Sequence, residues 1–395
     1  MRRALTDDRL VLGGLLLLAA AVRFPGLAAR GTFDQDQGHD ALTLLRLIQG
    51  GGLPLLGPPT SIGDFHHGAF YYYLLAPAAM ISGGDPVVIT AWIALLGVAA
   101  VGVTWWLAKA IAGPVAGPLA GFVAGLLLAV SPAAIDESTF IWNPNPIPLF
   151  ASLALAAAWR AHQTGRARWW TLAIACAGMV VQLHVLGVVF LPPILALLVA
   201  DWRAARRRGE TDSARQLARG GWAGLGIVAL LFVPLLLHEL QFDWSETRNA
   251  IAYFTSGGSG QGQLALVPRL VFTLIRIIAW PLVRDVTSLV PVSIALAAVL
   301  TLGPLVTLRA TGERRTALTW LVLTIVWSTV ALTFLAPSLQ TVVAGLPNDH
   351  YHAFLDPVIV TIIGVAIGLL ATGVIPFARR QAFGRPALGV AAAAQ

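Results

Sequence analysis

Long apolar segments recur along this chain, and they constrain its fold more than any other feature. The hydrocarbon core of a bilayer is ~30 Å thick, and an α-helix crosses it in about 20 residues. Val87–Ile111 and Leu289–Leu308 are two clear segments of this length. A backbone that faces lipid must satisfy its hydrogen bonds internally, so each such segment forms a helix. The sequence therefore predicts an all-α polytopic membrane protein with about ten transmembrane helices.

The arginines predict the orientation of this bundle. The chain carries a formal net charge of +7, and its basic residues fall mainly in short turns between apolar segments, such as Arg160–Arg168, Asp201–Arg219 and Arg309–Arg315. An excess of Lys and Arg marks cytoplasmic loops of a cell membrane protein. The alternate loops then face the periplasm or the cell exterior. A basic chain can also bind nucleic acid, but arginines placed between apolar segments argue against that partner.

The first outer loop is the longest and covers residues 30–85. It includes two apolar stretches that are too short to cross a bilayer. We expect a surface helix over Gly38–Ile48 and an interfacial helix over Ala69–Ile81, both on the outer face. Residues 1–375 are predicted to form one transmembrane domain that carries the functional site, followed by a short basic cytoplasmic tail, residues 376–395.

Acidic residues gather in this first outer loop. Ionisable side chains are costly next to hydrocarbon, so such a cluster at a membrane boundary is a functional hypothesis by default. Asp36 and Asp40 lie four residues apart, and a carboxylate shielded from water can act as a general base toward a hydroxyl. Neighbouring acids could instead hold a divalent cation, although no metal site is required. A solvated loop that caps a helix explains the acids about equally well.

His66, His67 and Tyr71 follow in the same loop. Adjacent histidines point in different directions, so hydrogen bonds to a polar ligand suit them better than a shared metal ion. The tyrosines at positions 71–73 are better explained as an interfacial belt than as direct ligand contacts. The single cysteine, Cys176, lies within an apolar segment, so the sequence predicts neither a disulfide framework nor a metal-thiolate site.

Three further outer segments carry candidate binding residues. Two asparagines, each followed by proline, are held rigid and could bind hydroxyl groups or only mark the start of a helix. A glutamine and a histidine interrupt a long apolar segment, either as a satisfied buried pair or as part of a site. The last segment contributes a histidine and a tyrosine before the final span. These residues are Asn143, Asn145, Gln182, His184, His350 and Tyr351.

Cations also occur along one apolar segment, Val267–Val283, which we expect to lie at the outer interface rather than to span. Arg276 and Arg284 could bind the anionic phosphate of a lipid, because guanidinium groups suit bidentate phosphate contact. The alternative is that these side chains only reach past the apolar surface toward lipid headgroups.

Taken together, these motifs resemble the bacterial branch of the protein mannosyltransferase-like membrane glycosyltransferases (family 39, GT-C fold), relatives of the lipid A aminoarabinose transferases. The resemblance runs in family order over nearly the whole chain. The motifs are Asp36–Asp40, Leu55–Gly63, Gly68–Pro77, Trp142–Pro146, Gln182–His184, and His350–Tyr351 with Pro357.

The resemblance implies transfer of a sugar from a polyprenyl-phosphate carrier to an acceptor hydroxyl on a lipid, glycan or protein, at the outer face of the cytoplasmic membrane and usually with inversion. The family's acidic residue in the first outer loop corresponds to Asp36, the expected catalytic base. Many members have Asp-Glu there, whereas this chain has Asp36-Gln37, which makes Asp40 the substitute for the second acid. The rival hypotheses are a transporter or flippase for an anionic lipid, and a lipid-binding subunit without activity.

Overall fold

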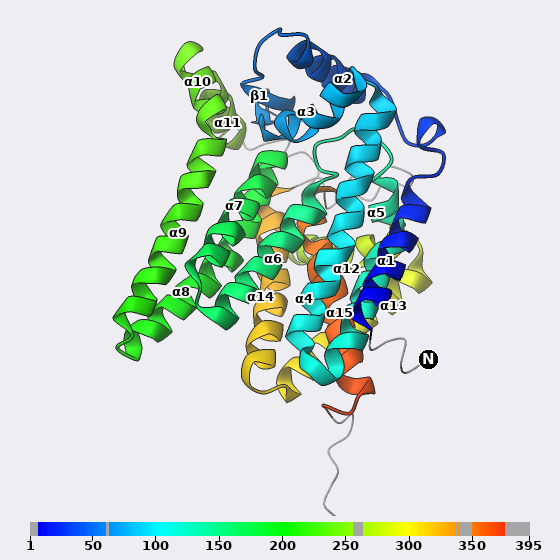
Figure 1. The fold of residues 1–395 in the computed structure, drawn as a ribbon, viewed down its shortest axis with the longest axis vertical. Coiled ribbons are helices and arrows are strands. Elements are labelled where there is room, and N and C mark those ends of the chain that lie inside the picture. The colour runs from blue at the N-terminus through cyan, green and yellow to red at the C-terminus, as the bar shows by residue number, and fades with distance from the viewer. Residues whose placement is uncertain (1–6, 61–62, 256–263, 337–338, 340–349, 376–395) are drawn as a thin grey trace, which may run out of the picture.

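The computed structural model describes residues 7–60, 63–255, 264–336, 339 and 350–375, and helices make up most of them (Figure 1). The first half of the chain forms one long helical hairpin, several bundle helices and a small outer layer. Its elements are α1 (Asp8–Arg23), η2 (Leu27–Ala29), α2 (Gln35–Ile48), β1 (Leu56–Pro59), β2 (His66–Gly68), α3 (Phe70–Ser82), α4 (Pro86–Ala129), α5 (Pro132–Asp136), α6 (Ile147–Thr164) and α7 (Ala167–Leu183).

The second half completes the bundle and adds two short helices at the end where α2 lies. Its elements are η3 (Val185–Phe190), α8 (Leu191–Arg207), α9 (Thr211–Leu231), α10 (Val233–Gln241), α11 (Ser245–Thr255), α12 (Leu266–Val283), α13 (Leu289–Arg309), α14 (Gly312–Leu335), η5 (His350–Leu355) and α15 (Asp356–Ala371).

Seven helices of the described chain are long and apolar enough to cross a membrane, or eight if α9 and α10, bent by 44°, form one span. The chain is thus a multi-pass membrane protein, as predicted, although this measure gives fewer spans than the expected ten. One reason is α4, which counts once but folds back at Gly113 (φ 79°, ψ −175°). A Cβ at Gly125 would lie 3.2 Å from that of Trp105, so the two halves of α4 run side by side. Another is that α7 has only 17 residues.

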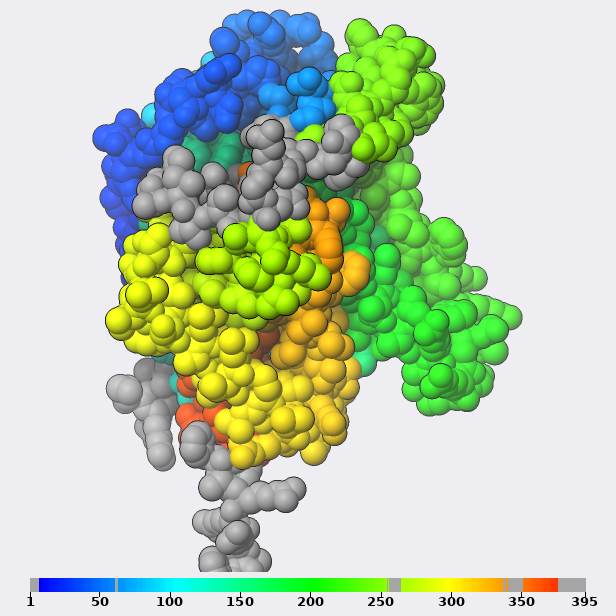
Figure 2. Space-filling view, turned by 180° about the vertical axis from the view of Figure 1, so that it is seen from behind, coloured from blue at the N-terminus to red at the C-terminus, as the bar shows by residue number. Residues whose placement is uncertain are grey.

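Helix α12 also meets the length and hydropathy of a span, whereas the sequence predicted an interfacial position for it. Figure 2 shows this helix, in yellow-green, running across the bundle rather than along its long axis. Its length and composition therefore allow a crossing, while its direction differs from that of the neighbouring bundle helices.

Helix α15 forms the centre of the bundle, where it packs against α4. Nearly all of its residues are buried, as expected for a helix that is apolar on every side. The contact is close because small residues face each other: a Cβ at Gly364 would lie 2.5 Å from the carbonyl oxygen of Ala120, and one at Gly368 2.8 Å from that of Ala116. Close approach through Gly and Ala is the usual way in which membrane helices associate.

The outer layer consists of α2, the β1–β2 hairpin and α3, with α10 and α11 beside it (Figure 1). The predicted helices over Gly38–Ile48 and Ala69–Ile81 correspond to α2 and α3. The side chain of Asp34 caps α2, and Gln37 completes a capping box by accepting from the backbone N–H of Asp34. A glutamate at position 37 could complete the same capping box, so this contact does not account for the departure from Asp-Glu. The basic α8–α9 turn lies at the opposite end of the molecule.

Two tyrosines of α3 correct the interpretation as an interfacial belt. Tyr71 and Tyr72 are 0% and 1% exposed, so they are core residues between α3 and its neighbours. Tyr73 is half-buried, and its hydroxyl donates to the carbonyl oxygen of Pro54 at 2.6 Å. These side chains therefore fix the outer layer rather than anchor it in lipid headgroups.

Candidate functional site

Three predicted site residues from distant parts of the chain come together at the end of α7. The ring of His67, on β2, lies 4.7 Å from that of His184, whose ring lies 5.5 Å from that of Tyr351 in η5. The Nδ1 atom of His67 accepts from the backbone N–H of Val185 at 3.3 Å, and Nδ1 of His184 accepts from that of Leu186 at 3.2 Å. Both imidazoles are therefore neutral, with the proton on Nε2.

The environment of His67 agrees with that protonation state. Burial, and after it the neighbouring His184 and His66, hold the pKa of His67 well below its usual value. The ring thus stays uncharged at neutral pH and can offer its Nε2–H as a hydrogen-bond donor.

Amide side chains surround this histidine pair. Asn143 Nδ2 donates to the carbonyl oxygen of Leu183 at 2.6 Å, just before His184. Gln182 is 1% exposed, and within the described structure its amide nitrogen and oxygen have no hydrogen-bond partner. A Cβ at Gly68 would overlap that amide, so glycine is required there. Buried polar groups are normally paired, which makes the Gln182 amide a candidate ligand contact.

Asn145 occupies a different environment from the histidine pair. Its Nδ2 donates to the carbonyl oxygen of Phe140 at 2.8 Å. The side chain lines a small cavity together with Arg23, Glu137 and Ser138. The structure therefore separates the roles of the two asparagines that the sequence grouped together.

The two candidate catalytic acids of the first loop lie one turn apart on α2 with opposite exposure. Asp36 is exposed in the first turn of the helix, whereas Asp40 is 2% exposed. The Tyr72 hydroxyl donates to Asp40 Oδ1 at 2.8 Å, and His39 Nδ1 lies 3.4 Å from the same atom. Burial raises the pKa of Asp40 to about 6, although the hydrogen bonds from Tyr72 and His39 oppose that rise.

Replacement of Asp40 by Asn is expected to remove one component of the pH dependence of stability. The folded pKa of about 6 exceeds the value of 3.8 for an unperturbed Asp. The folded state therefore binds the proton more tightly. This contribution, about 3 kcal/mol, is fully present below pH ~4, is lost progressively as pH rises from ~4 through ~6, and is absent at higher pH. Asn keeps an oxygen for the Tyr72 hydroxyl. Unfolding free energies of both proteins in mixed micelles between pH ~4 and ~8 would test this, and parallel curves would contradict it.

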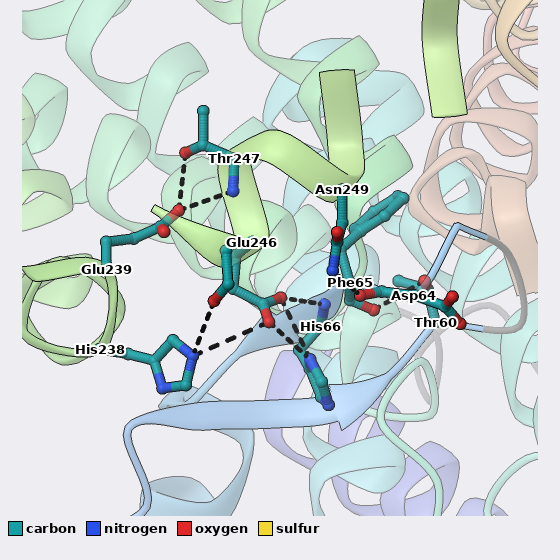
Figure 3. A network of polar contacts seen from close by, with 10 residues as sticks. Thr60, Asp64, Phe65, His66, His238, Glu239, Glu246, Thr247 and Asn249 are labelled. Atoms are coloured by element: carbon teal, nitrogen blue, oxygen red, sulfur yellow. Dashed lines mark hydrogen bonds and ion pairs between the residues drawn. The ribbon is translucent and has the colours of Figure 1, made fainter. Parts of the chain in front are cut away.

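A second polar network joins the first loop to α11 (Figure 3). The Glu246 carboxylate accepts from the backbone N–H of His66 at 2.7 Å and lies 3.1 Å from His66 Nδ1. His238 Nε2 lies 3.9 Å from Glu246 Oε1. Glu246 was not predicted. The signal available in the sequence was its position in the polar outer loop after α9, where three acids occur within eight residues.

The two arginines predicted to bind phosphate both contact protein groups. Arg284 Nη2 lies 2.5 Å from Asp136 Oδ2, an ion pair between the end of α12 and α5. Arg284 also has a left-handed backbone (φ 63°), a costly conformation for a residue other than glycine. Arg276 is 2% exposed and donates to the carbonyl oxygen of Leu339 at 3.3 Å. Asp136 is a further site candidate that the sequence did not single out.

Two remaining expectations concern His350 and a metal ion. His350 begins η5, but its side chain lies outside the described residues. Within the part of the chain that the structure describes, no group of three or more His, Cys, Asp or Glu side chains is arranged to hold a metal ion.

Comparison with known proteins identifies the fold. Residues 66–238 match the family model described as dolichyl-phosphate-mannose-protein mannosyltransferase. The fold is similar to that of ArnT from Cupriavidus metallidurans in the apo state, with a TM-score of 0.59, 16% identity and 91% of this chain covered. It is similarly close to the same protein bound to undecaprenyl phosphate, with a TM-score of 0.58, 15% identity and 92% of this chain covered. No curated protein sequence matches the chain significantly.

These findings confirm the resemblance to protein mannosyltransferases and to the aminoarabinose transferase, and with it the expected GT-C fold. The chain spans 59% of the length of the apo ArnT chain and 61% of the length of the ArnT chain bound to undecaprenyl phosphate. The matched segment begins at His66 and includes His67, Asn143 and His184, so it contains most of the polar cluster described above.

Proposed function

We propose that this chain is a membrane glycosyltransferase that moves a sugar from a polyprenyl-phosphate-linked donor to an acceptor hydroxyl. The observation that carries this proposal is that the family match over residues 66–238 contains the histidine pair that the fold packs at one end of the bundle. ArnT, whose fold is similar, has a crystal structure with undecaprenyl phosphate bound, which supports a lipid-linked donor for this chain.

The site faces the periplasm or the cell exterior in this proposal. The basic turn between α8 and α9 lies at the opposite end of the molecule from α2 and the β1–β2 hairpin (Figure 1). Cytoplasmic loops carry the excess of Lys and Arg. The orientation that satisfies this rule puts the polar end outside.

Asp36 acts as the base in the proposed reaction. Its carboxylate takes the proton from the acceptor hydroxyl as that oxygen forms a bond to the anomeric carbon, and the bond from that carbon to the carrier phosphate breaks. Attack on the face opposite the leaving phosphate inverts the configuration. Exposure favours Asp36 over Asp40 for this role, because Asp40 is buried and already accepts from Tyr72. Asp40 instead positions α2 on α3.

Arg284 stabilises the charge that develops on the leaving phosphate, with Arg276 as the second candidate. Arg284 is 42% exposed and at present faces Asp136, so a phosphate would share or replace that carboxylate. Arg276 is buried, which favours Arg284 for direct contact. A phosphate is a good leaving group, and protonation by a separate acid is not required.

The test is incubation of the purified protein with radiolabelled polyprenyl-phosphate sugars and a membrane extract that supplies acceptors. We expect label to leave the carrier and to appear in a glycosylated product. The same donors in proteoliposomes would test the rival hypothesis, since movement of intact lipid between leaflets without product would indicate a flippase. Lipid retained on the protein without turnover or movement would indicate a binding subunit.

A further inference from the structure

His66 and His67 are adjacent on β2 and serve opposite faces of the hairpin, because successive side chains of a strand alternate. His67 faces the bundle, where it packs on His184. His66 faces α10 and α11, which together we call the outer arm (Val233–Thr255) (Figure 3). The two imidazoles of one motif therefore have different partners.

The carboxylate of Glu246 determines which nitrogen of His66 carries the proton. An ionised carboxylate only accepts hydrogen bonds, so the Nδ1 atom that lies 3.1 Å from both of its oxygens must be the protonated one. In the neutral ring Nε2 then carries a lone pair, and it has no hydrogen-bond partner within the described residues. The side chain is 32% exposed, so a ligand can reach it. This tautomer is the reverse of that of His67 and His184.

The outer arm is attached to the first loop at other points as well. Asn249 Nδ2 donates to the carbonyl oxygen of Asp64 at 2.8 Å. The ring of Tyr253 lies 6.2 Å from that of Phe65. The arm therefore has contacts with the first loop besides the one between Glu246 and the His66 ring, including the bond from the backbone N–H of His66 to Glu246 at 2.7 Å. A nearly buried carboxylate is costly unless it accepts such hydrogen bonds.

We propose that Glu246 is a positioning residue that fixes His66 as a hydrogen-bond acceptor for a hydroxyl group of a bound sugar, on either the donor or the acceptor. The inference rests on the proposed function and names a further contact of the same site. A neutral imidazole with its lone pair on Nε2 can only accept there, so it selects a hydroxyl rather than a phosphate oxygen or a carbonyl. His67, with its Nε2–H group, has the complementary preference.

The first test measures the tautomer and does not depend on activity. Nitrogen NMR of protein labelled in histidine, at a pH of about 8 where an ordinary imidazole is neutral, distinguishes the two nitrogens. We expect the proton of His66 on Nδ1 in the wild type and a shift toward Nε2 in Glu246→Leu; His66→Asn identifies the signals. Glu239→Leu is the matched control, because Glu239 is also buried and accepts from one backbone N–H and one side chain, both of Thr247. A proton on Nε2 of His66 in the wild type would overturn the proposal.

The second test measures transfer kinetics with the labelled polyprenyl-phosphate sugars. In His66→Asn the amide nitrogen can still donate to Glu246, but the acceptor at Nε2 is lost. We expect this variant and Glu246→Leu to lower kcat/KM by about 3- to 10-fold, the effect of one lost hydrogen bond, and Glu239→Leu to stay within about 2-fold of the wild type.

The two substrates are distinguished by which KM rises. An increase for the labelled donor assigns the hydroxyl to the transferred sugar, and an increase for the acceptor extract assigns it to the acceptor. Full activity of His66→Asn would mean that the contact is only structural and would refute the inference. Absence of transfer by the wild type would instead refute the proposed function, while the NMR result would stand.

Discussion

Replacement of Asp36 by Asn is expected to lower the rate of sugar transfer by about 10²- to 10⁴-fold, the usual contribution of a general base. Asn has nearly the same shape but cannot take a proton from the acceptor hydroxyl. Asp36 is exposed in the first turn of α2, so the change leaves the protein core intact. Release of label from a polyprenyl-phosphate sugar, measured with saturating acceptor extract, would give the rate.

Asp34→Asn is the matched control for this experiment. Asp34 is also exposed, lies two residues away and caps α2 by accepting from the backbone N–H of Asp36 at 3.1 Å. Asn is as good an N-cap as Asp, so the helix is preserved while a neighbouring charge is removed. We expect near wild-type transfer. Full activity of Asp36→Asn together with loss of activity in Asp40→Asn would reassign the base to Asp40.

Replacement of Arg23 by Leu is expected to lower the free energy of unfolding by about 3 kcal/mol, because three buried carbonyl oxygens lose a donor. Arg23 ends α1 and is 0% exposed. Its Nη atoms donate to Ala129 at 2.8 Å, Leu128 at 3.1 Å and Ala19 at 3.3 Å, and Nε lies 3.3 Å from Ser138 Oγ. One guanidinium thus satisfies the end of α4 and joins it to α1 and to the segment after α5.

Arg30→Leu separates the effect of burial from that of removing an arginine. Arg30 also donates to backbone carbonyls, including Val22 at 3.1 Å and Pro25 at 3.2 Å, but it is partly exposed, so water can replace it. We expect a loss below about 1 kcal/mol. Equilibrium unfolding in mixed micelles would compare the two variants. Equal losses in the free energy of unfolding would show that the burial of Arg23 does not increase its contribution to stability.

Helices were the most predictable part of this fold, because hydropathy alone marks a segment that must bury its backbone in lipid. The turn within α4 was also predictable, since Gly113 is followed by a proline. The β1–β2 hairpin was not predicted. Its strands have only four and three residues, too few to show an alternating hydrophobic pattern. The pairing of Leu56 with Gly68 joins residues that the local sequence does not link.

The candidate site was predictable in its position but not in its partners. His67, His184 and Tyr351 were expected on one face because the basic loops place all three of their segments outside, and the structure brings them into contact. The contact of Glu246 with His66 joins residues 180 positions apart. The pairing of Arg284 with Asp136 likewise crosses between α12 and α5. Which residues pair across helices depends on how the helices pack. The hydrophobic periodicity of a single sequence identifies the helices but not their neighbours.

The alternation of His66 and His67 on one short strand has a thermodynamic consequence. Strand β2 has three residues and hydrogen-bonds on one side to Glu246 of the outer arm and on the other to Val185 of the bundle. A ligand on either side would therefore contact the same short strand. If one ligand shifts that strand, it changes the affinity of the other by some factor, and the second must change the first by the same factor. The hairpin is therefore the element through which a ligand on one side would change the affinity for a ligand on the other. The affinity for each substrate should be measured with the other substrate present and absent.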